Sequence, residues 1–169
     1  YVNEFESDRD QVLQRAVDAG VERFYLPAID RESGSSMLDL ADKYPDRCIP
    51  MIGLHPCSVK SAYTDELSYV EQMLHGRKFA AIGEIGLDYY WDKQFINEQK
   101  IAFEHQITLA NKYSLPIVIH TREAMRDTID LVKANPVDRK GIFHCFGGSV
   151  EEAKQIIELG FYLGIGGVL

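Results

Sequence analysis

The stretch "KFAAIGEIGLDYYW", Lys78 to Trp91, places one acidic residue inside an apolar strand. Glu84 stands at the centre of this strand, between Gly83 and Gly86. An ionised carboxylate is costly to bury unless it is paired. We therefore expect a partner for the Glu84 carboxylate. The apolar residues that predict burial on both strand faces are Ala80, Ala81, Ile82, Ile85 and Leu87.

Segments with helical periodicity alternate with short apolar segments on both sides of this stretch. Ser7 with Asp10, and Ser149 with Glu152, have the spacing of helix capping boxes. The pattern predicts six helices and six strands. The expected helices are 7–20, 35–45, 64–76, 94–113, 123–135 and 150–159. The expected strands are 21–30, 47–56, 78–88, 115–120, 141–146 and 161–169.

This alternation predicts an α/β fold with parallel strands covered by helices. No GxGxxG motif follows the first strand, which weakens a dinucleotide-binding doubly wound sheet. Polar residues fall at successive strand ends, as they do at the catalytic rim of a (β/α)8 TIM barrel. These residues are Asp30, His55, the segment 84–88, His120 and His144.

We expect one domain over residues 1–169, because no linker or low-complexity tract divides the chain. A barrel of this kind needs eight strands and about 250 residues. The six expected strands would form an incomplete barrel with two bare edges. We therefore expect that the native polypeptide carries a strand before Tyr1 and further units after Leu169.

Composition narrows the classes of function. The formal charge of −8 argues against a protein that coats duplex DNA with a broad basic face. No apolar run approaches the roughly 20 residues that cross a bilayer, so we expect no membrane association. The three cysteines match neither a zinc ribbon nor a disulfide framework. They indicate reduced thiols in a cytoplasmic protein, and Cys145 is expected to be buried.

Glu84, His120 and His144 come from three successive strands and are expected at the same end of the sheet. Carboxylate and imidazole groups that converge there suit zinc, manganese or a related divalent ion. If Glu84 is shared by two metal ions, those ions are the partner that its buried carboxylate needs. Gly83 and Gly86 would allow backbone or ligand to approach closely.

His55 ends a strand before a proline, so it is either a site residue or a turn residue. Arg122 follows His120 by two residues and could clamp a phosphate, although a surface ion pair is an equal alternative. Asp88 and Tyr89 lie where the loop after the Glu84 strand begins, and they are predicted substrate contacts. Aromatic rings in this loop could stack on bases or pack on the barrel itself.

The segments "GLHP", "GEIGLDYY", "PIVIHTRE" and "FHCFGG", in this order and spacing, make the chain similar to the TatD-related deoxyribonucleases over essentially all its residues. The resemblance implies a metal-dependent hydrolase on a (β/α)8 barrel that cleaves DNA phosphodiester bonds, typically as a 3′ to 5′ exonuclease on single strands or frayed ends. It implies two divalent ions (Mg, Zn or Mn). It matches Glu84 to the bridging carboxylate, His120 and His144 to metal ligands, and His55 and Arg122 to positions near the substrate phosphate.

The chain departs from this family's pattern at both ends. The family's early His-x-His pair and its late Asp do not occur in this sequence. Two further interpretations therefore stay open. The same metal shell could hydrolyse a small ester or cyclic amide, as in the wider amidohydrolase group, or the chain could be a binding module without catalysis.

Overall fold

The computed structural model describes residues 1–167 and contains the predicted alternation of helices and strands. The helices are α1 (Arg9–Asp18), α2 (Arg31–Lys43), α3 (Tyr63–Gly76), α4 (Ile96–Lys112), α5 (Met125–Ala134) and α6 (Val150–Glu158), with short 3-10 helices η1 (Asn3–Phe5) and η2 (Pro56–Ser58). The strands are β1 (Phe24–Leu26), β2 (Cys48–Pro50), β3 (Ile82–Asp88), β4 (Ile117–Arg122), β5 (Ile142–Phe143) and β6 (Tyr162–Leu163).

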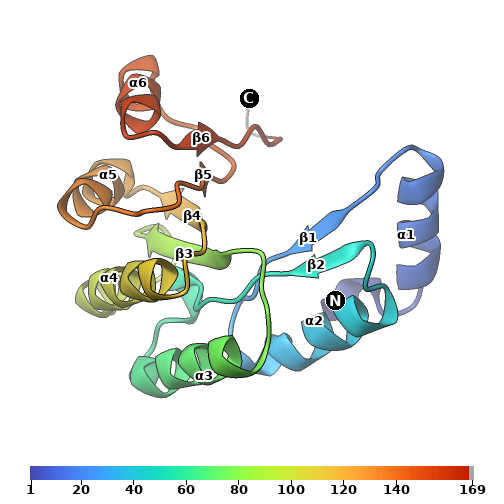
Figure 1. Cartoon of the computed structure of the whole chain (residues 1–169). Coiled ribbons are helices and arrows are strands. Elements are labelled where there is room, and N and C mark those ends of the chain that lie inside the picture. The colour runs from blue at the N-terminus through green and yellow to red at the C-terminus, as the bar shows by residue number, and fades with distance from the viewer. Residues whose placement is uncertain (168–169) are drawn as a thin grey trace.

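All described strand pairs are parallel, and each strand lies beside the next one in the chain. Hydrogen bonds group them as β1-β2 and β3-β4-β5-β6, and a bridge between Ile52 and Ile82 joins the two groups. A doubly wound sheet would reverse the strand order at a switch point. The sequential order is that of a barrel, and six strands form an arc of it (Figure 1).

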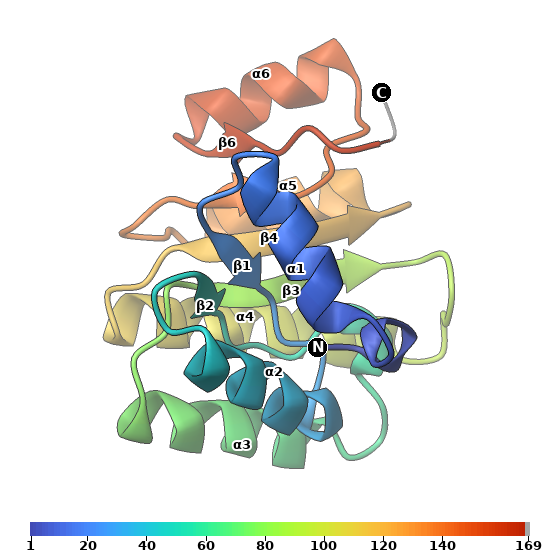
Figure 2. The same ribbon diagram turned by 90° about the vertical axis from the view of Figure 1, so that its right-hand side faces the viewer.

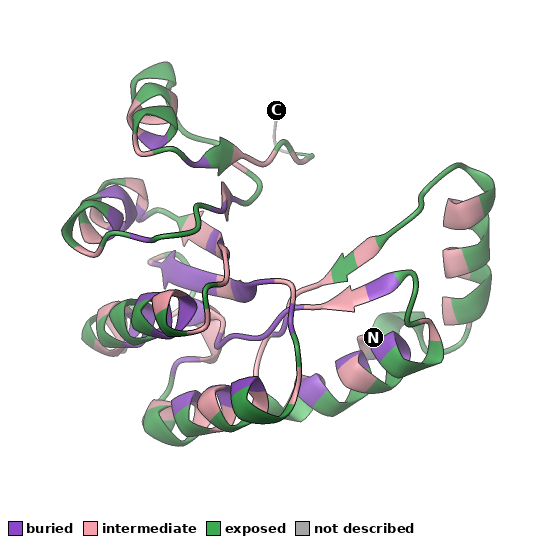
Figure 3. Cartoon of the chain, in the orientation of Figure 1, coloured by how far each residue is buried: buried purple, intermediate pink, exposed green. Residues whose placement is uncertain are grey.

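Helices α2 to α6 cover the outer side of this arc (Figures 1 and 2). The main apolar core lies between these helices and the strands. β3 is buried along nearly its whole length, as its sequence predicts (Figure 3). The capping box of Ser149 and Glu152 at α6 is confirmed.

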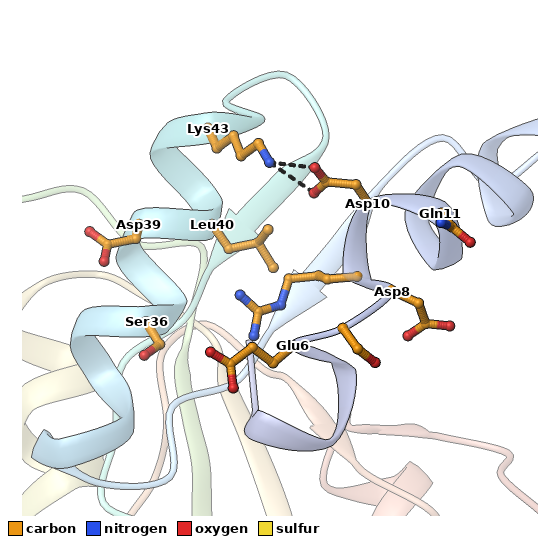
Figure 4. A pocket seen from close by; sticks show the side chains of 10 residues that line it. Glu6, Asp8, Asp10, Gln11, Ser36, Asp39, Leu40 and Lys43 are labelled. Atoms are coloured by element: carbon orange, nitrogen blue, oxygen red, sulfur yellow. Dashed lines mark hydrogen bonds and ion pairs between the residues drawn. The ribbon is translucent and has the colours of Figure 1, made fainter.

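The first helix differs from its prediction. α1 begins after Asp8 without a side-chain cap, so the capping box of Ser7 and Asp10 is wrong. None of its residues is buried. Asp10 instead forms two bonds of 2.6 and 2.8 Å with Lys43 of α2, beside a hollow of about 500 Å³ between the two helices (Figure 4).

The strands at the two ends of the arc are shorter than predicted. The last one covers Tyr162–Leu163, and residues 168–169 of the predicted strand lie outside the described part.

Cys145 is exposed, which corrects the expectation that it is buried. β5 ends at Phe143, and the positive φ of 46° at Cys145 turns the chain out of the strand. Within residues 1–167, no helix has the length and apolarity needed to cross a membrane.

Candidate metal centre

The centre lies at the carboxyl ends of β3 and β4, which pair closely because β3 contains glycines. Gly86 pairs with His120, and a Cβ atom at Gly86 would lie 2.0 Å from the His120 carbonyl oxygen. Gly86 also has a φ of 138°, a conformation that glycine tolerates best. These glycines therefore admit the backbone of the neighbouring strand, one of the two uses predicted for them.

The partner of Glu84 is histidine. Oε1 of Glu84 lies 2.8 Å from Nδ1 of His144 and 3.7 Å from Nδ1 of His120. Burial by itself would raise the pKa of Glu84, but the interactions with these two histidines outweigh it and lower the pKa to about 2. Glu84 is therefore ionised at neutral pH, and within residues 1–167 no lysine or arginine forms an ion pair with it.

His120 is fixed in one tautomer by Asp88. Its Nε2 atom lies 2.9 Å from Oδ2 of Asp88. An ionised carboxylate only accepts hydrogen bonds, so Nε2 carries a proton and the Nδ1 lone pair of the neutral ring faces Glu84. Burial tends to lower the pKa of His120, but Glu84 and Asp88 together raise it. The second proton of the charged ring would lie on Nδ1, and a cation bound at Nδ1 would replace that second proton.

The imidazole ring of His55 lies beside that of His120. It caps η2, where its Nδ1 atom accepts a hydrogen bond of 3.2 Å from the backbone N–H of Cys57. Its ring centroid lies 4.5 Å from that of His120. Burial, and then the charge of His120, lower the pKa of His55 to about 4. The neutral ring therefore carries its proton on Nε2, as a hydrogen-bond donor.

These residues form a candidate metal site. Ligand atoms of His55, Glu84 and His120 all lie within 4.8 Å of one another. His144 is outside this group, but its Nδ1 atom faces the same Glu84 oxygen. One partly buried carboxylate and neighbouring imidazoles are the donor set of zinc and related divalent ions. The donor atoms of Glu84, His120 and His144 therefore fit a metal.

The sequence did not reveal two buried glutamines of α4 that hold the strand ends. Gln106 accepts a bond of 2.7 Å from Leu54 N and donates one of 3.2 Å to Leu54 O, next to His55. Gln99 binds the backbone of Asp88 in the same way: it accepts a bond of 2.9 Å from Asp88 N and donates one of 3.1 Å to Asp88 O. The two glutamines lie seven residues apart, on one face of the helix. This spacing is the only sequence signal for their shared role.

Asp88 and Tyr89 are directed at protein partners. Asp88 is 1% exposed, and besides binding His120 it accepts hydrogen bonds from the backbone N–H groups of Tyr90 and Trp91. The Tyr89 hydroxyl donates to Asp127 of α5 at 2.8 Å. This geometry favours positioning roles over the direct substrate contacts that the sequence predicts for Asp88 and Tyr89.

Arg122 lies across the strand pair from Asp88. Its guanidinium carbon lies 3.7 Å from the ring centroid of Tyr90. Among residues 1–167, no carboxylate lies within ion-pair distance of Arg122, and its side chain forms no hydrogen bond. Its donors are therefore available to an anion at the rim.

Comparison with known proteins places this site in a family. The model of the family described as TatD related DNase matches residues 1–169, so the chain belongs to this family. The "uncharacterized metal-dependent hydrolase YabD" of Bacillus subtilis (strain 168) is 35% identical over 165 residues, which cover 97% of this chain and 64% of that protein. The "3'-5' ssDNA/RNA exonuclease TatD" of Erwinia tasmaniensis is 31% identical over 165 residues, with coverage of 97% and 64%.

The solved structures agree with the fold. The crystal structure of YjjV, a TatD homologue from Escherichia coli K12, superposes with a TM-score of 0.91 at 33% identity, covering 98% of this chain and 64% of that one. The incomplete TIM barrel expected from the sequence is thus confirmed. The chain spans about 64% of the length of these relatives.

Proposed function

We propose that this chain carries part of the active site of a metal-dependent phosphodiesterase that acts on single-stranded nucleic acid, most simply as a 3′ to 5′ exonuclease. The observation that carries the proposal is the meeting of Glu84, His120, His144 and His55 at one barrel rim, with the uncommitted guanidinium of Arg122 beside them. The name of the relative from Erwinia tasmaniensis, a ssDNA/RNA exonuclease, supports the choice of substrate.

Each residue of the chain has a distinct role in this proposal. Glu84, His120 and His144 would hold the divalent cations. His55 donates a hydrogen bond from its Nε2–H to a phosphate oxygen. Arg122 binds a second phosphate oxygen with the planar geometry that suits phosphate.

We propose two divalent ions, because a carboxylate has two oxygens and both His120 and His144 face the same one, Oε1 of Glu84. Bound ions would neutralise charge on the phosphate and activate the attacking water. In this arrangement the chain's own groups orient the phosphate, and the strand glycines keep the site compact. A site rich in positive charge also reconciles a net charge of −8 with an anionic substrate.

The proposal is tested by substrate profiling of the purified protein loaded with Mg²⁺, Mn²⁺ or Zn²⁺. Single-stranded oligonucleotides labelled at the 5′ or the 3′ end, duplexes, carboxylic esters and cyclic amides are compared, and EDTA is the control. We expect cleavage of single strands that starts at the 3′ end. Hydrolysis of the esters or amides alone would favour the amidohydrolase alternative, and metal binding without any hydrolysis would favour a binding module.

A further inference from the structure

Two exposed aromatic rings and one guanidinium lie together in the loop after β3. Trp91 is 67% exposed and Tyr90 is 45% exposed. Their ring centroids lie 4.8 Å apart and the rings are nearly perpendicular. The Arg122 guanidinium carbon lies 3.7 Å from the Tyr90 centroid and 5.3 Å from the Trp91 centroid. We call these three residues the rim platform.

The rim platform is fastened to the candidate metal centre. Oδ1 of Asp88 accepts hydrogen bonds from the backbone N–H groups of Tyr90 and Trp91, at 2.9 and 3.1 Å. Oδ2 of the same side chain binds His120. One buried carboxylate therefore sets both the loop that carries the rings and a ligand of the proposed metal. Two neighbouring aromatic side chains that are exposed while their backbone is fixed form an apolar surface of the kind that marks interaction sites.

We propose that the rim platform stacks on a nucleobase of the single-stranded nucleic acid whose phosphate enters the metal centre. Flat aromatic rings and arginine planes bind the faces of bases without sequence preference. The guanidinium donors, free of carboxylate partners among residues 1–167, suit the adjoining phosphate. A base next to a phosphate matches this pair of surfaces, whereas a small ester has no such face. The inference rests on the proposed function and specifies how its substrate is held.

Trp91 makes the test direct because it is the single tryptophan of the chain. Its fluorescence is followed in EDTA, which prevents turnover, during titration with oligothymidylate and with an abasic oligonucleotide of equal length. Base stacking predicts quenching by oligothymidylate and an affinity for the abasic strand that is lower by about 5-fold or more. Equal affinity for the two strands would overturn the platform.

Variants are measured by the anisotropy of a labelled oligothymidylate. Tyr90→Ala and Trp91→Ala should each weaken binding by about 5- to 150-fold, the range of base stacking on aromatic rings. Tyr113→Ala is the matched control, because Tyr113 also lies under a cation, Lys112, but at the far end of α4. Binding that is unchanged in Tyr90→Ala and Trp91→Ala, with their circular dichroism intact, would overturn the proposal.

The outcomes separate this proposal from the proposed function. Base-independent binding by a protein that does cleave oligonucleotides, when loaded with metal, would overturn the platform and leave the phosphodiesterase standing. Base-dependent binding without cleavage would support the platform and contradict the hydrolysis. Failure to bind either strand would overturn the platform.

Discussion

The Nε2 atom of His120 lies 2.9 Å from the Oδ2 atom of Asp88, a carboxylate that is 1% exposed. The other oxygen of Asp88 accepts two backbone N–H groups from the loop that follows β3. The carboxylate has no proton to donate in this arrangement, so His120 must present a protonated Nε2 to it. The Nδ1 lone pair is thereby directed toward Glu84, where a metal ligand is needed.

We predict that Asp88→Asn lowers metal affinity by about 10- to 100-fold, the usual cost of losing a carboxylate behind a ligating histidine. The amide oxygen of Asn can still accept the two loop N–H groups, which leaves its NH₂ group facing His120. Nε2 must then accept rather than donate, so the proton moves to Nδ1 and blocks the metal. Calorimetric titration with Zn²⁺ or Mn²⁺ measures the change.

The control for that variant is Asp92→Asn. Asp92 lies in the same loop but is only partly buried, and it pairs with Lys60 at 2.6 Å. Its metal affinity should equal that of the unmodified protein. An Asp88→Asn protein with unchanged metal affinity would show that the tautomer of His120 does not depend on Asp88.

Gly86→Ala should destabilise the fold by about 3 kcal/mol or more, because an added methyl group in a close-packed strand pair forces the backbone apart. The new Cβ would lie 2.0 Å from the His120 carbonyl oxygen, at a φ of 138°. Gly76→Ala is the matched control, since nothing lies within 4 Å of its added Cβ. Urea unfolding compares the two, and equal midpoints would contradict the close approach of β3 and β4.

Gln106→Leu should lower the free energy of unfolding by about 2 to 4 kcal/mol, because it leaves both the N–H and the C=O of Leu54 buried without partners. Gln72→Leu, on the exposed side of α3, should change it by less than about 0.5 kcal/mol. Unfolding curves that coincide for the two variants would argue against the clamp at Leu54.

Much of the fold could be predicted from the sequence because its signals are local. The apolar runs and helical periodicity of a parallel α/β fold gave all six helices and six strands of residues 1–167 in order. The barrel followed from polar residues at successive strand ends, and its incompleteness followed from the count of six strands against the eight of a full barrel. The predicted strands were longer than the observed ones, since β5 and β6 consist of two residues each. Only the pairing of strands in three dimensions sets where each strand begins and ends.

The candidate site was predictable in its residues but not in its connections. Glu84 required a partner on energetic grounds, and the histidines of the following strands were the available ones. The link from Asp88 to His120 spans 32 residues of sequence, so no local pattern reveals it. Gln99 and Gln106 have the appearance of solvent-facing helix residues, and only tertiary packing shows that both are buried.

Arg122→Lys should reduce kcat/KM on single-stranded DNA while leaving metal affinity unchanged. Lysine keeps the charge but loses both the planar two-point contact with phosphate and the stack on Tyr90. Arg126→Lys, whose side chain is 93% exposed on α5, is the control. Equal activity of the two variants on oligonucleotides would make Arg122 a surface residue without a substrate role.

Calorimetric titration of Glu84→Gln with Mn²⁺ or Zn²⁺ shows whether Glu84 holds the metal. Glutamine keeps the volume of the side chain and removes its charge, so the fold should persist in circular dichroism. Glu104→Gln, an exposed change on α4, should behave as the unmodified protein. We predict that Glu84→Gln loses bound metal and, with it, hydrolysis of single-stranded DNA. Undiminished metal stoichiometry in this variant would contradict the role of Glu84 as a metal ligand.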